Sequence, residues 1–469
     1  MGTSSMEWHV MQCFGERLPG EEVKDVDIIS AMEFDAGGNN FAAGDHGGRV
    51  VLFEKGERKP KAVGPDSRPS GRAEPNFEYR YLTEFQSHVP EFDYLRSLEI
   101  LGKINKVRWC EPNNRSRLLL STNDKTVKLW RICERKVRHL SDFNVKNVKG
   151  VEGLIGSVPR KSAEGKEGRG LDHPSQLRLP RVVGTESVLS SCCLRSYANA
   201  HVYHINSVSL NSDQATFLSA DDLRVHLWNL EVSDTSFNMV DMKPNNMEDL
   251  EEVITCADFH PHHCNIFTFA SSKGIIRLAD MRKSARCESY EQVMGIKLNP
   301  EGKSFFSEMI SSISDLKFSA DGRYILVRDY MTLRLWDMHM TTAPVATYNV
   351  HEQLRSGLCQ LFENDAIFDK FTCCFSPDGQ HVATGTYNNL FRVFGRGDGT
   401  NMWQESSWES QAQVGDAVEG KTGKSVCPAN GLAVDNLNSS SKILHLSWHP
   451  SQPVMAVGAC TSLYLFYTS

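Results

Sequence analysis

The run FHPHHC, residues 259–264, is a dense group of possible metal ligands. Histidine nitrogens and a cysteine sulfur suit zinc, but a structural zinc site needs four ligands, usually as two spaced pairs. No second pair follows at a suitable spacing, and the run WHPSQP at residues 448–453 repeats the His-Pro step. We therefore interpret His-Pro as a turn that ends a strand, and we expect no metal.

Two glycine-rich runs resemble motifs that bind phosphate or metal ions. GKTGKS, at residues 420–425, resembles a phosphate-binding loop, but Val418 stands where that motif needs its first glycine. GDHGG, at residues 44–48, resembles a metal-phosphatase motif, but its Asp and His are adjacent instead of separated by one residue. No GxSxG nucleophile turn occurs. We expect no catalytic residue and no cofactor.

The polar group Asn123-Asp124-Lys125 interrupts the apolar stretch 118–132, as an active-site loop would. The same phrase recurs along the chain as a small or polar turn, an alternating strand and an aromatic residue or its substitute. The seven copies are residues 44–55, 121–132, 219–230, 271–282, 327–338, 385–396 and 458–469. A turn that recurs in this way indicates a repeated structural unit.

A second apolar strand precedes each copy, and turns such as SADGR and SPDGQ follow these strands. Such turns between alternating strands are typical of β-hairpins. Seven antiparallel units with little helical periodicity predict an all-β fold, a seven-bladed β-propeller of the WD-repeat kind. We expect one propeller domain over residues 8–469.

A propeller must close on itself, because an open ring leaves unpaired strand edges on its first and last blades. The seventh copy leaves its blade one strand short. We expect the run WHVMQCFG, residues 8–15, to supply that strand.

Two aspartates occupy the same place in neighbouring repeats. Asp124 and Asp222 each lie six residues before a tryptophan, Trp130 and Trp228. An aspartate at such a corner commonly accepts hydrogen bonds from the backbone of its own turn. We therefore expect both residues to hold corners.

Three intervals between repeats exceed the ~40–45 residues that one blade needs. In the first, residues 78–101 alternate aromatic and polar residues, which predicts a projecting β-hairpin arm that either packs on the ring or binds a partner. Residues 133–200 and 395–441 are rich in charged residues or in Ser, Asn and Gly. Such compositions predict flexible insertions.

An acidic run follows Asn246, which is suited to cap one helical turn. Its acidic residues are Glu248, Asp249, Glu251 and Glu252. Together with the Asp221-Asp222 corner, they form an acidic region that suits a basic peptide. An ordinary solvated surface is the equal alternative.

Bulk properties narrow the class of protein. The chain of 469 residues has a net charge of −7, which argues against general nucleic-acid affinity. No apolar run approaches the ~18 residues that span a bilayer, so no membrane association is expected. The 13 cysteines are scattered without a CxxC pair, which is typical of a reducing compartment. We expect a cytoplasmic location, with the nucleus as a further compartment.

Several stretches outside the repeated pattern resemble one family, the 55-kilodalton B-type regulatory subunits of protein phosphatase 2A. They include FQSHVPEFDYLRSLEI, SFNMVDMKPNNMEDLEEVITCADFHP, SFFSEMISSISDLKFS and ENDAIFDKF. The resemblance runs from about residue 20 to the C-terminus and weakens in residues 55–76, 133–195 and 395–441. It implies a non-catalytic subunit of a heterotrimer, with a helical-repeat scaffold subunit and a catalytic subunit as partners. It also implies phosphoprotein substrates that carry basic segments.

The resemblance also implies binding residues. Substrate contacts fall on Asp222 of SADDLR and Leu250 of NMEDL, and more weakly on Glu248, Asp249, Glu91, Asp93 and His46. His46 stands where the family has a basic residue, so a contact that needs a full positive charge is in doubt. Scaffold contacts fall on the hairpin arm, at Phe85, Phe92, Tyr94, Leu95 and Leu98.

The residues alone leave other functions open. A generic WD-repeat scaffold, or the substrate receptor of a ligase, would carry the same blades and corners. An enzyme with its own site is a more distant alternative, because the catalytic motifs are incomplete.

Overall fold

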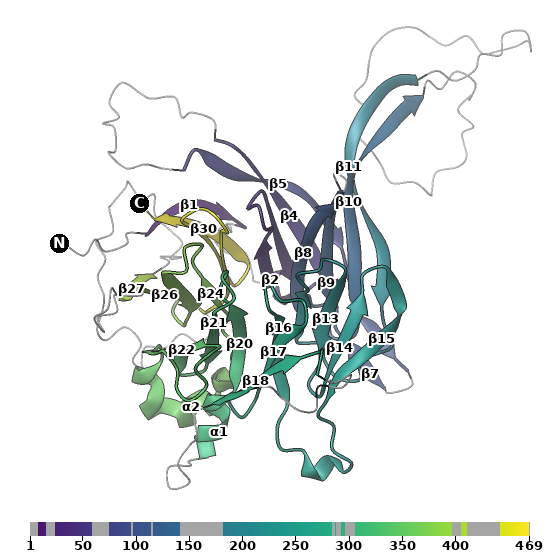
Figure 1. The fold of residues 1–469 in the computed structure, drawn as a ribbon. Helices are drawn as coiled ribbons and strands as arrows, with labels where there is room; N and C mark the ends of the chain where they lie inside the picture. The colour runs from purple at the N-terminus through teal and green to yellow at the C-terminus, as the bar shows by residue number, and fades with distance from the viewer. Residues whose placement is uncertain are drawn as a thin grey trace, which may run out of the picture. The chain divides into compact units, whose positions relative to one another are not determined.

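The computed structural model describes residues 8–15, 24–58, 75–94, 97–113, 116–140, 182–283, 287, 292–295, 305–395, 405–409 and 441–468. Its strands form seven four-stranded sheets, the blades of a β-propeller, and one two-stranded sheet (Figure 1). The chain divides into two compact units, residues 1–131 with 192–469, and residues 132–191. The all-β, seven-bladed fold predicted from the repeats is therefore confirmed.

Each blade from the first to the sixth uses four strands in chain order. Blade 1 contains β2 (Ile29–Phe34), β3 (Asn40–Asp45), β4 (Arg49–Glu57) and β5 (Phe77–Gln86); blade 2 contains β8 (Lys106–Asn113), β9 (Ser116–Thr122), β10 (Val127–Leu140) and β11 (Val182–Tyr197). Blade 3 contains β12 (Ser207–Leu210), β13 (Thr216–Ala220), β14 (Arg224–Asn229) and β15 (Val232–Asp241); blade 4 contains β16 (Ile254–Phe259), β17 (Ile266–Ser271), β18 (Ile275–Asp280) and β19 (Gln292–Gly295). Blade 5 contains β20 (Ile313–Phe318), β21 (Tyr324–Asp329), β22 (Thr332–Asp337) and β23 (Ala346–Asn349); blade 6 contains β24 (Cys373–Phe375), β25 (His381–Gly385), β26 (Leu390–Gly395) and β27 (Glu405–Glu409).

Blade 7 takes its fourth strand from the other end of the chain. β28 (Ile443–Trp448), β29 (Val454–Ala459) and β30 (Ser462–Thr468) are completed by β1 (Trp8–Phe14), which pairs antiparallel with β30. The indole of Trp8 packs edge-on against Trp448 at 5.5 Å and against Phe391 of blade 6 at 5.6 Å. Because no covalent link joins the first and last blades directly, this pairing closes the ring.

The repeated aromatic residue of the third strand fills the space between blades. Trp228 on β14 packs with Leu120 and Leu129 of blade 2, and Trp336 on β22 packs with Ile276 of blade 4. Both indoles are at most 2% exposed. Full burial of such a large apolar side chain contributes about 1.5–3 kcal/mol, so these residues stabilise the contact between neighbouring blades.

The two His-Pro turns join neighbouring blades through hydrogen bonds of their histidines. His260 Nε2 donates to the carbonyl of Gly322 at 3.1 Å, while its Nδ1 accepts from two backbone N–H groups. His449 makes the same bond to Gly38 at 3.2 Å. A Cβ at Gly38, where φ is +66°, would lie 2.2 Å from His449 Cε1. Only glycine fits this close approach.

The hairpin arm expected over residues 78–101 is corrected by the structure. Residues 78–86 belong to β5, which pairs with β4 as the outer strand of blade 1. Only β6 (Glu91–Asp93) and β7 (Leu98–Ile100) form a separate hairpin, the two-stranded sheet. The alternation that suggested an arm is the alternation of a half-buried blade strand.

The two insertions expected to be flexible also contain strands. β10 and β11 of blade 2 continue into residues 132–140 and 182–191, which belong to the second unit. β27 lies inside the expected insertion 395–441 and pairs with β26. The rest of both insertions, residues 141–181 and most of 396–440, lies outside the described part of the chain.

Short helices occur between blades. α1 (Phe305–Ser311) precedes blade 5, and η5 (Glu352–Gly357), α2 (Leu358–Glu363) and η6 (Ala366–Phe368) precede blade 6. Two further 3-10 turns in the described part of the chain are η1 (Asp25–Asp27) and η3 (Met247–Asp249). Among the described residues, no helix has the length and apolarity to cross a membrane.

Candidate interaction face

One end of the first unit collects the described segments that join consecutive blades. In a four-stranded meander, the turn between the second and third strands and the link to the next blade lie at the same end. Backbone bonds tie them together: Ile104 N donates to Asp45 O, Ile205 N to Asp124 O, and Ile254 N to Asp222 O. We call this end the upper face, and it holds the sequence-predicted substrate residues.

The corner turns of the upper face are held by the residue before each expected aspartate. Asn123 Oδ1 accepts from the N–H groups of Lys125 and Thr126, at 3.0 and 2.9 Å. Asp221 Oδ1 accepts in the same way from the two residues that follow Asp222, at 2.9 and 2.7 Å. The expectation that Asp124 and Asp222 hold the turns is therefore wrong by one position.

Asp221 is also the end of a buried polar chain. Trp228 Nε1 donates to Ser219 Oγ at 2.8 Å, Ser219 Oγ lies 2.6 Å from His201 Nε2, and His201 Nδ1 lies 2.9 Å from Asp221 Oδ2. Burial alone would raise the pKa of Asp221, but the hydrogen bond from His201 holds it below the ordinary value. His201, Asp221 and His226 could together hold a metal ion. Because both ring nitrogens of His201 already have partners, we assign this cluster to the core.

Because Asp221 accepts the hydrogen bonds of the turn, the side chain of Asp222 is not needed to hold it. Its side chain is half-buried, and burial raises its pKa, against the opposing effect of Lys370. Its backbone carbonyl, rather than its carboxylate, accepts the bond from Ile254 N at 2.7 Å. The carboxylate is therefore available for a ligand without any change to the backbone.

The acidic loop, residues 246–252, lies between β15 and β16. Asn246 caps η3 by accepting from Glu248 N at 3.3 Å, as the sequence suggested. Two of its four acids are neutralised, because Glu251 pairs with Lys273 at 2.5 Å and Glu252 pairs with Arg277. Within the described residues, no ion pair involves Glu248 or Asp249, and both are exposed. Leu250, beside them, is half-buried.

An exposed group of phenylalanines lies on the links that precede blades 5 and 6. Phe305 is 68% exposed, Phe368 54% and Phe362 36%. Phe362 contacts Phe305, Phe306 and Phe368 at ring separations of 5.8, 6.0 and 6.0 Å. We call these four residues the aromatic patch. Sequence reasoning missed it, because none of the four lies in the repeated pattern.

The acidic loop and the aromatic patch are neighbours on the upper face. The pKa of Lys273 is raised mainly by its hydrogen bond to Glu251. The negative charges of Glu251, of Glu252 and of Glu308, which lies on α1, raise it further. α1, which carries Phe305 and Phe306, therefore lies close to Lys273, the residue that pairs with Glu251 of the acidic loop. This face combines carboxylates with apolar rings, the chemistry that suits a segment with both basic and apolar side chains.

The remaining predicted substrate residues lie elsewhere on the upper face. Burial and Lys103 lower the pKa of His46 to about 4, so its imidazole is neutral at pH 7. Glu91 and Asp93 lie on β6, and Glu91 is exposed. These carboxylates share the face with Asp222, but no described contact joins the two groups.

The predicted scaffold residues fall into two environments. Phe85 is 8% exposed and packs on Trp130 at 4.6 Å, so it belongs to the core and is unavailable to a partner. Phe92, Tyr94 and Leu98 are 49%, 86% and 39% exposed on the β6–β7 hairpin. Leu95 lies outside the described residues. A partner surface therefore remains on the hairpin without Phe85.

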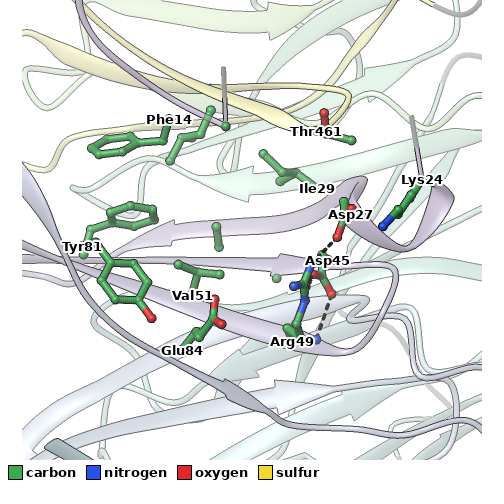
Figure 2. A pocket seen from close by; sticks show the side chains of 15 residues that line it. Phe14, Lys24, Asp27, Ile29, Asp45, Arg49, Val51, Tyr81, Glu84 and Thr461 are labelled. Carbon is green, nitrogen blue, oxygen red and sulfur yellow. Dashed lines mark hydrogen bonds and ion pairs between the residues drawn. The ribbon is translucent and has the colours of Figure 1, made fainter. Parts of the chain in front are cut away.

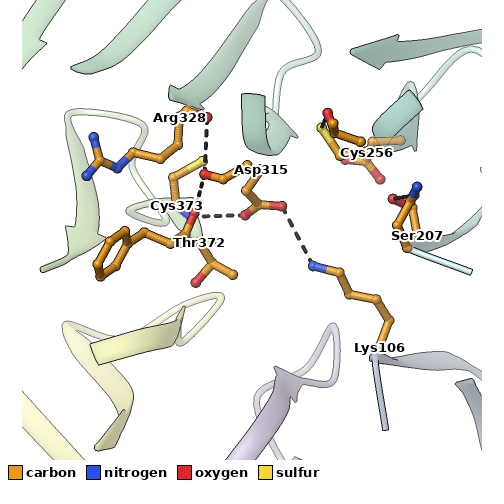
Figure 3. Close-up of polar contacts among 12 residues, drawn as sticks. Lys106, Ser207, Cys256, Asp315, Arg328, Thr372 and Cys373 are labelled. Carbon is orange, nitrogen blue, oxygen red and sulfur yellow. Dashed lines mark hydrogen bonds and ion pairs between the residues drawn. The ribbon is translucent and has the colours of Figure 1, made fainter. Parts of the chain in front are cut away.

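The propeller axis is crossed by charged side chains. Lys106 Nζ of blade 2 lies 3.8 Å from Asp315 Oδ1 of blade 5, and Cys373 N of blade 6 donates to Asp315 Oδ2 at 3.0 Å (Figure 3). Burial opposes ionisation of Asp315, but these partners hold its pKa below the ordinary value. The cavity that remains has a volume of about 50 Å³. Side chains of blades 2, 5 and 6 thus meet across the axis.

A larger hollow lies between blades 7 and 1. Its volume is about 510 Å³, and its apolar walls include Phe14, Ile29 and Val51 (Figure 2). At one end, Arg49 donates to Asp45 Oδ2 at 2.8 Å and pairs with Asp27. Arg49, Asp45 and Asp27 pair with one another and hold the first corner of blade 1.

Comparisons with known proteins match the chain over almost its full length. The family model described as WD domain, G-beta repeat matches residues 191–229 and 366–394. The beta isoform of the 55 kDa regulatory B subunit of serine/threonine protein phosphatase 2A from Arabidopsis thaliana is 50% identical and covers 99% of this chain and 97% of the relative. The regulatory B subunit of protein phosphatase PP2A from Schizosaccharomyces pombe is 45% identical, with 98% and 97% covered.

Proposed function

The chain belongs to the family of 55 kDa regulatory B subunits of protein phosphatase 2A, and from this premise we propose that it recruits phosphoproteins to the phosphatase through its upper face. The chain itself is not catalytic, since its relatives are named as regulatory subunits and its fold is a WD-repeat propeller. A scaffold subunit and a catalytic subunit are its proposed partners.

One observation carries the proposal: carboxylates that form no ion pair among the described residues share the upper face with exposed aromatic rings. Asp222, Glu248 and Asp249 have no ion pair among the described residues, whereas Glu251 and Glu252 do. Unneutralised surface carboxylates attract basic segments at long range and increase their rate of encounter. The aromatic patch supplies apolar burial, which basic residues alone do not.

The mechanism is tethering. A basic segment that binds the acidic loop and Asp222 holds a nearby phosphoserine or phosphothreonine close to the catalytic subunit. The effective concentration of the phosphate then rises, to the millimolar range for a short linker. Neutral His46 adds no repulsion toward such a segment at pH 7. The regulatory chain therefore contributes affinity for the substrate and no chemistry on the phosphate.

Two elements are suited to hold the scaffold subunit. The β6–β7 hairpin exposes Phe92 and Tyr94, whose rings meet at 5.0 Å. The second unit exposes Leu140 (60%) and Val183 (71%) on two strands. An isolated two-stranded ribbon is marginally stable in water, so a partner that covers these apolar residues would stabilise it.

Reconstitution with purified scaffold and catalytic subunits tests the proposal. We expect the full chain to co-elute with both in gel filtration. The variants Phe92→Ser/Tyr94→Ser and Leu140→Ser/Val183→Ser then show which element docks, with Phe237→Ser, an exposed phenylalanine of blade 3, as control. If the chain elutes alone under conditions in which the scaffold binds the catalytic subunit, the regulatory role is refuted.

A further inference from the structure

A second hollow of the upper face lies between the β6–β7 hairpin and the corner of blade 2. Its volume is about 620 Å³, within the range of ligand pockets, roughly 300–1,000 Å³. Its lining residues include both acids and lysines, and we call it the hairpin cavity. The charged ones are Glu91, Asp93, Lys125 and Lys128.

The two lysines come from the blade 2 corner and are held in place by backbone carbonyls. Lys128 Nζ donates to Ser87 O at 2.9 Å, and Lys125 Nζ donates to Val202 O. A carbonyl satisfies one of the three N–H donors of an ammonium group but leaves its positive charge. Both side chains are half-buried, so their mobility is restricted. Two positioned ammonium groups in one cavity suit an anion with several acceptor oxygens.

The floor between the lysines is polar but uncharged. His88 is 2% exposed. Burial and the neighbouring Lys128 lower its pKa to about 3, so it is neutral at pH 7. Asn123 and Thr126 also line the floor. The charge preference of the cavity is therefore set by the lysines and by the acids of the hairpin.

The hairpin contributes the opposite charge. Glu91 and Asp93 are alternate residues of β6, so their side chains project from the same face of that strand. An anion alone would meet these carboxylates, and a cation alone would meet the two lysines. A segment that carries both charges close together satisfies both sides of the cavity.

We propose that the hairpin cavity binds a segment that carries a phosphorylated serine or threonine next to a basic residue. The phosphate, with a charge of about −1.5 to −2 at pH 7, contacts Lys125 and Lys128, and the basic residue contacts Glu91 and Asp93. This inference rests on the proposed function and adds to it a second phosphate on the substrate. That phosphate is held by the regulatory chain instead of being hydrolysed.

Fluorescence anisotropy with the full chain tests the proposal. The probe is a labelled synthetic peptide with one phosphoserine flanked by arginines, compared with the same peptide carrying serine. We expect the phosphopeptide to bind about fivefold to tenfold more tightly, as expected for two partly exposed charge contacts. Inorganic phosphate should compete for this advantage. Because the isolated chain is not catalytic, the probe stays intact.

Variants separate the two sides of the cavity. Lys125→Met/Lys128→Met should remove the preference for phosphate and leave the serine peptide unaffected, while Lys125→Arg/Lys128→Arg should retain it. Lys243→Met, an exposed lysine of the loop before blade 4, is the matched control and should change nothing. Equal binding of both peptides by the unaltered chain overturns the proposal. Equal loss of both peptides in the methionine variant, with unchanged circular dichroism, also overturns it.

Either result leaves the proposed function intact, because that function depends on assembly with the phosphatase and on Asp222.

Discussion

Reversal of the charge at Asp222 is the sharpest test of the proposal that the upper face binds basic segments. Asp221 holds the turn, and Asp222 bonds to Ile254 through its backbone carbonyl, so Asp222→Lys breaks no side-chain hydrogen bond or ion pair among the described residues. We expect a melting temperature close to that of the unaltered chain, since surface substitutions of this kind change stability by about 0.5 kcal/mol or less.

The magnitude follows from the half-buried position of the carboxylate. Two unit charges at 4 Å interact by about 1 kcal/mol in water and by about 4 kcal/mol at an effective dielectric constant of 20. Allowing about 1 kcal/mol for the lost attraction and a similar amount for the new repulsion gives about 2 kcal/mol. Because 1.4 kcal/mol is about a factor of ten, kcat/KM for a basic phosphopeptide should fall about thirtyfold at low salt.

The assay is phosphate release by the reconstituted heterotrimer at low and high salt. Asp222→Asn should lose about half of the free energy lost by Asp222→Lys, and the difference between them should shrink as salt screens the charges. Glu231→Lys is the matched control, because Glu231 is an exposed acid of the same blade on the opposite face. An unchanged kcat/KM in Asp222→Lys would refute the substrate role, and loss of scaffold binding would instead indicate collapse of the blade.

Four further predictions follow from the contacts. Asp221→Ala should lower the free energy of unfolding by about 3 kcal/mol in a denaturant titration, because it leaves buried donors unpaired; a change below 0.5 kcal/mol would contradict this. The free energy of unfolding should fall as the pH is lowered from 6.5 to 4. Burial lowers the pKa of His226 and His449 to about 4 in the folded chain, so over this range the unfolded chain binds protons that the folded chain does not. Calorimetry at several pH values checks this, and a melting temperature independent of pH would contradict it. Phe368→Ser should raise KM for protein substrates severalfold without affecting assembly, and an unchanged KM would exclude the aromatic patch. Deletion through β1 (Trp8–Phe14) should lower the melting temperature and broaden the transition, whereas an unaltered curve would mean that the ring does not need this strand.

The fold was predictable because its unit is repeated seven times. The repeats share the same turn and alternation, and those with an aromatic residue on the third strand can pack it on the preceding blade, as Trp336 does. A hydrophobic period is a local property, so the sequence alone displays it. The same locality explains the error over residues 78–86, whose alternation fits a projecting hairpin and a blade strand equally well.

The site was less predictable because it depends on which side chains face one another. Asp124 and Asp222 occupy equivalent positions in the sequence, yet Asn123 and Asp221 hold the turns. Which residue caps a turn depends on the direction in which its side chain points, and the sequence does not show that direction. Phe85 was expected to be an exposed aromatic residue and is buried against Trp130. The sequence does show the four phenylalanines of the aromatic patch outside the repeats. It does not show that they come together, because that depends on the packing of α1, α2 and η6.

The most direct measurement is the dephosphorylation of a basic phosphopeptide by the scaffold and catalytic subunits, with and without this chain. Tethering through the upper face predicts a lower KM in the presence of the chain, an unchanged kcat, and loss of the advantage at high salt. An equal KM with and without a co-eluting chain would contradict the account.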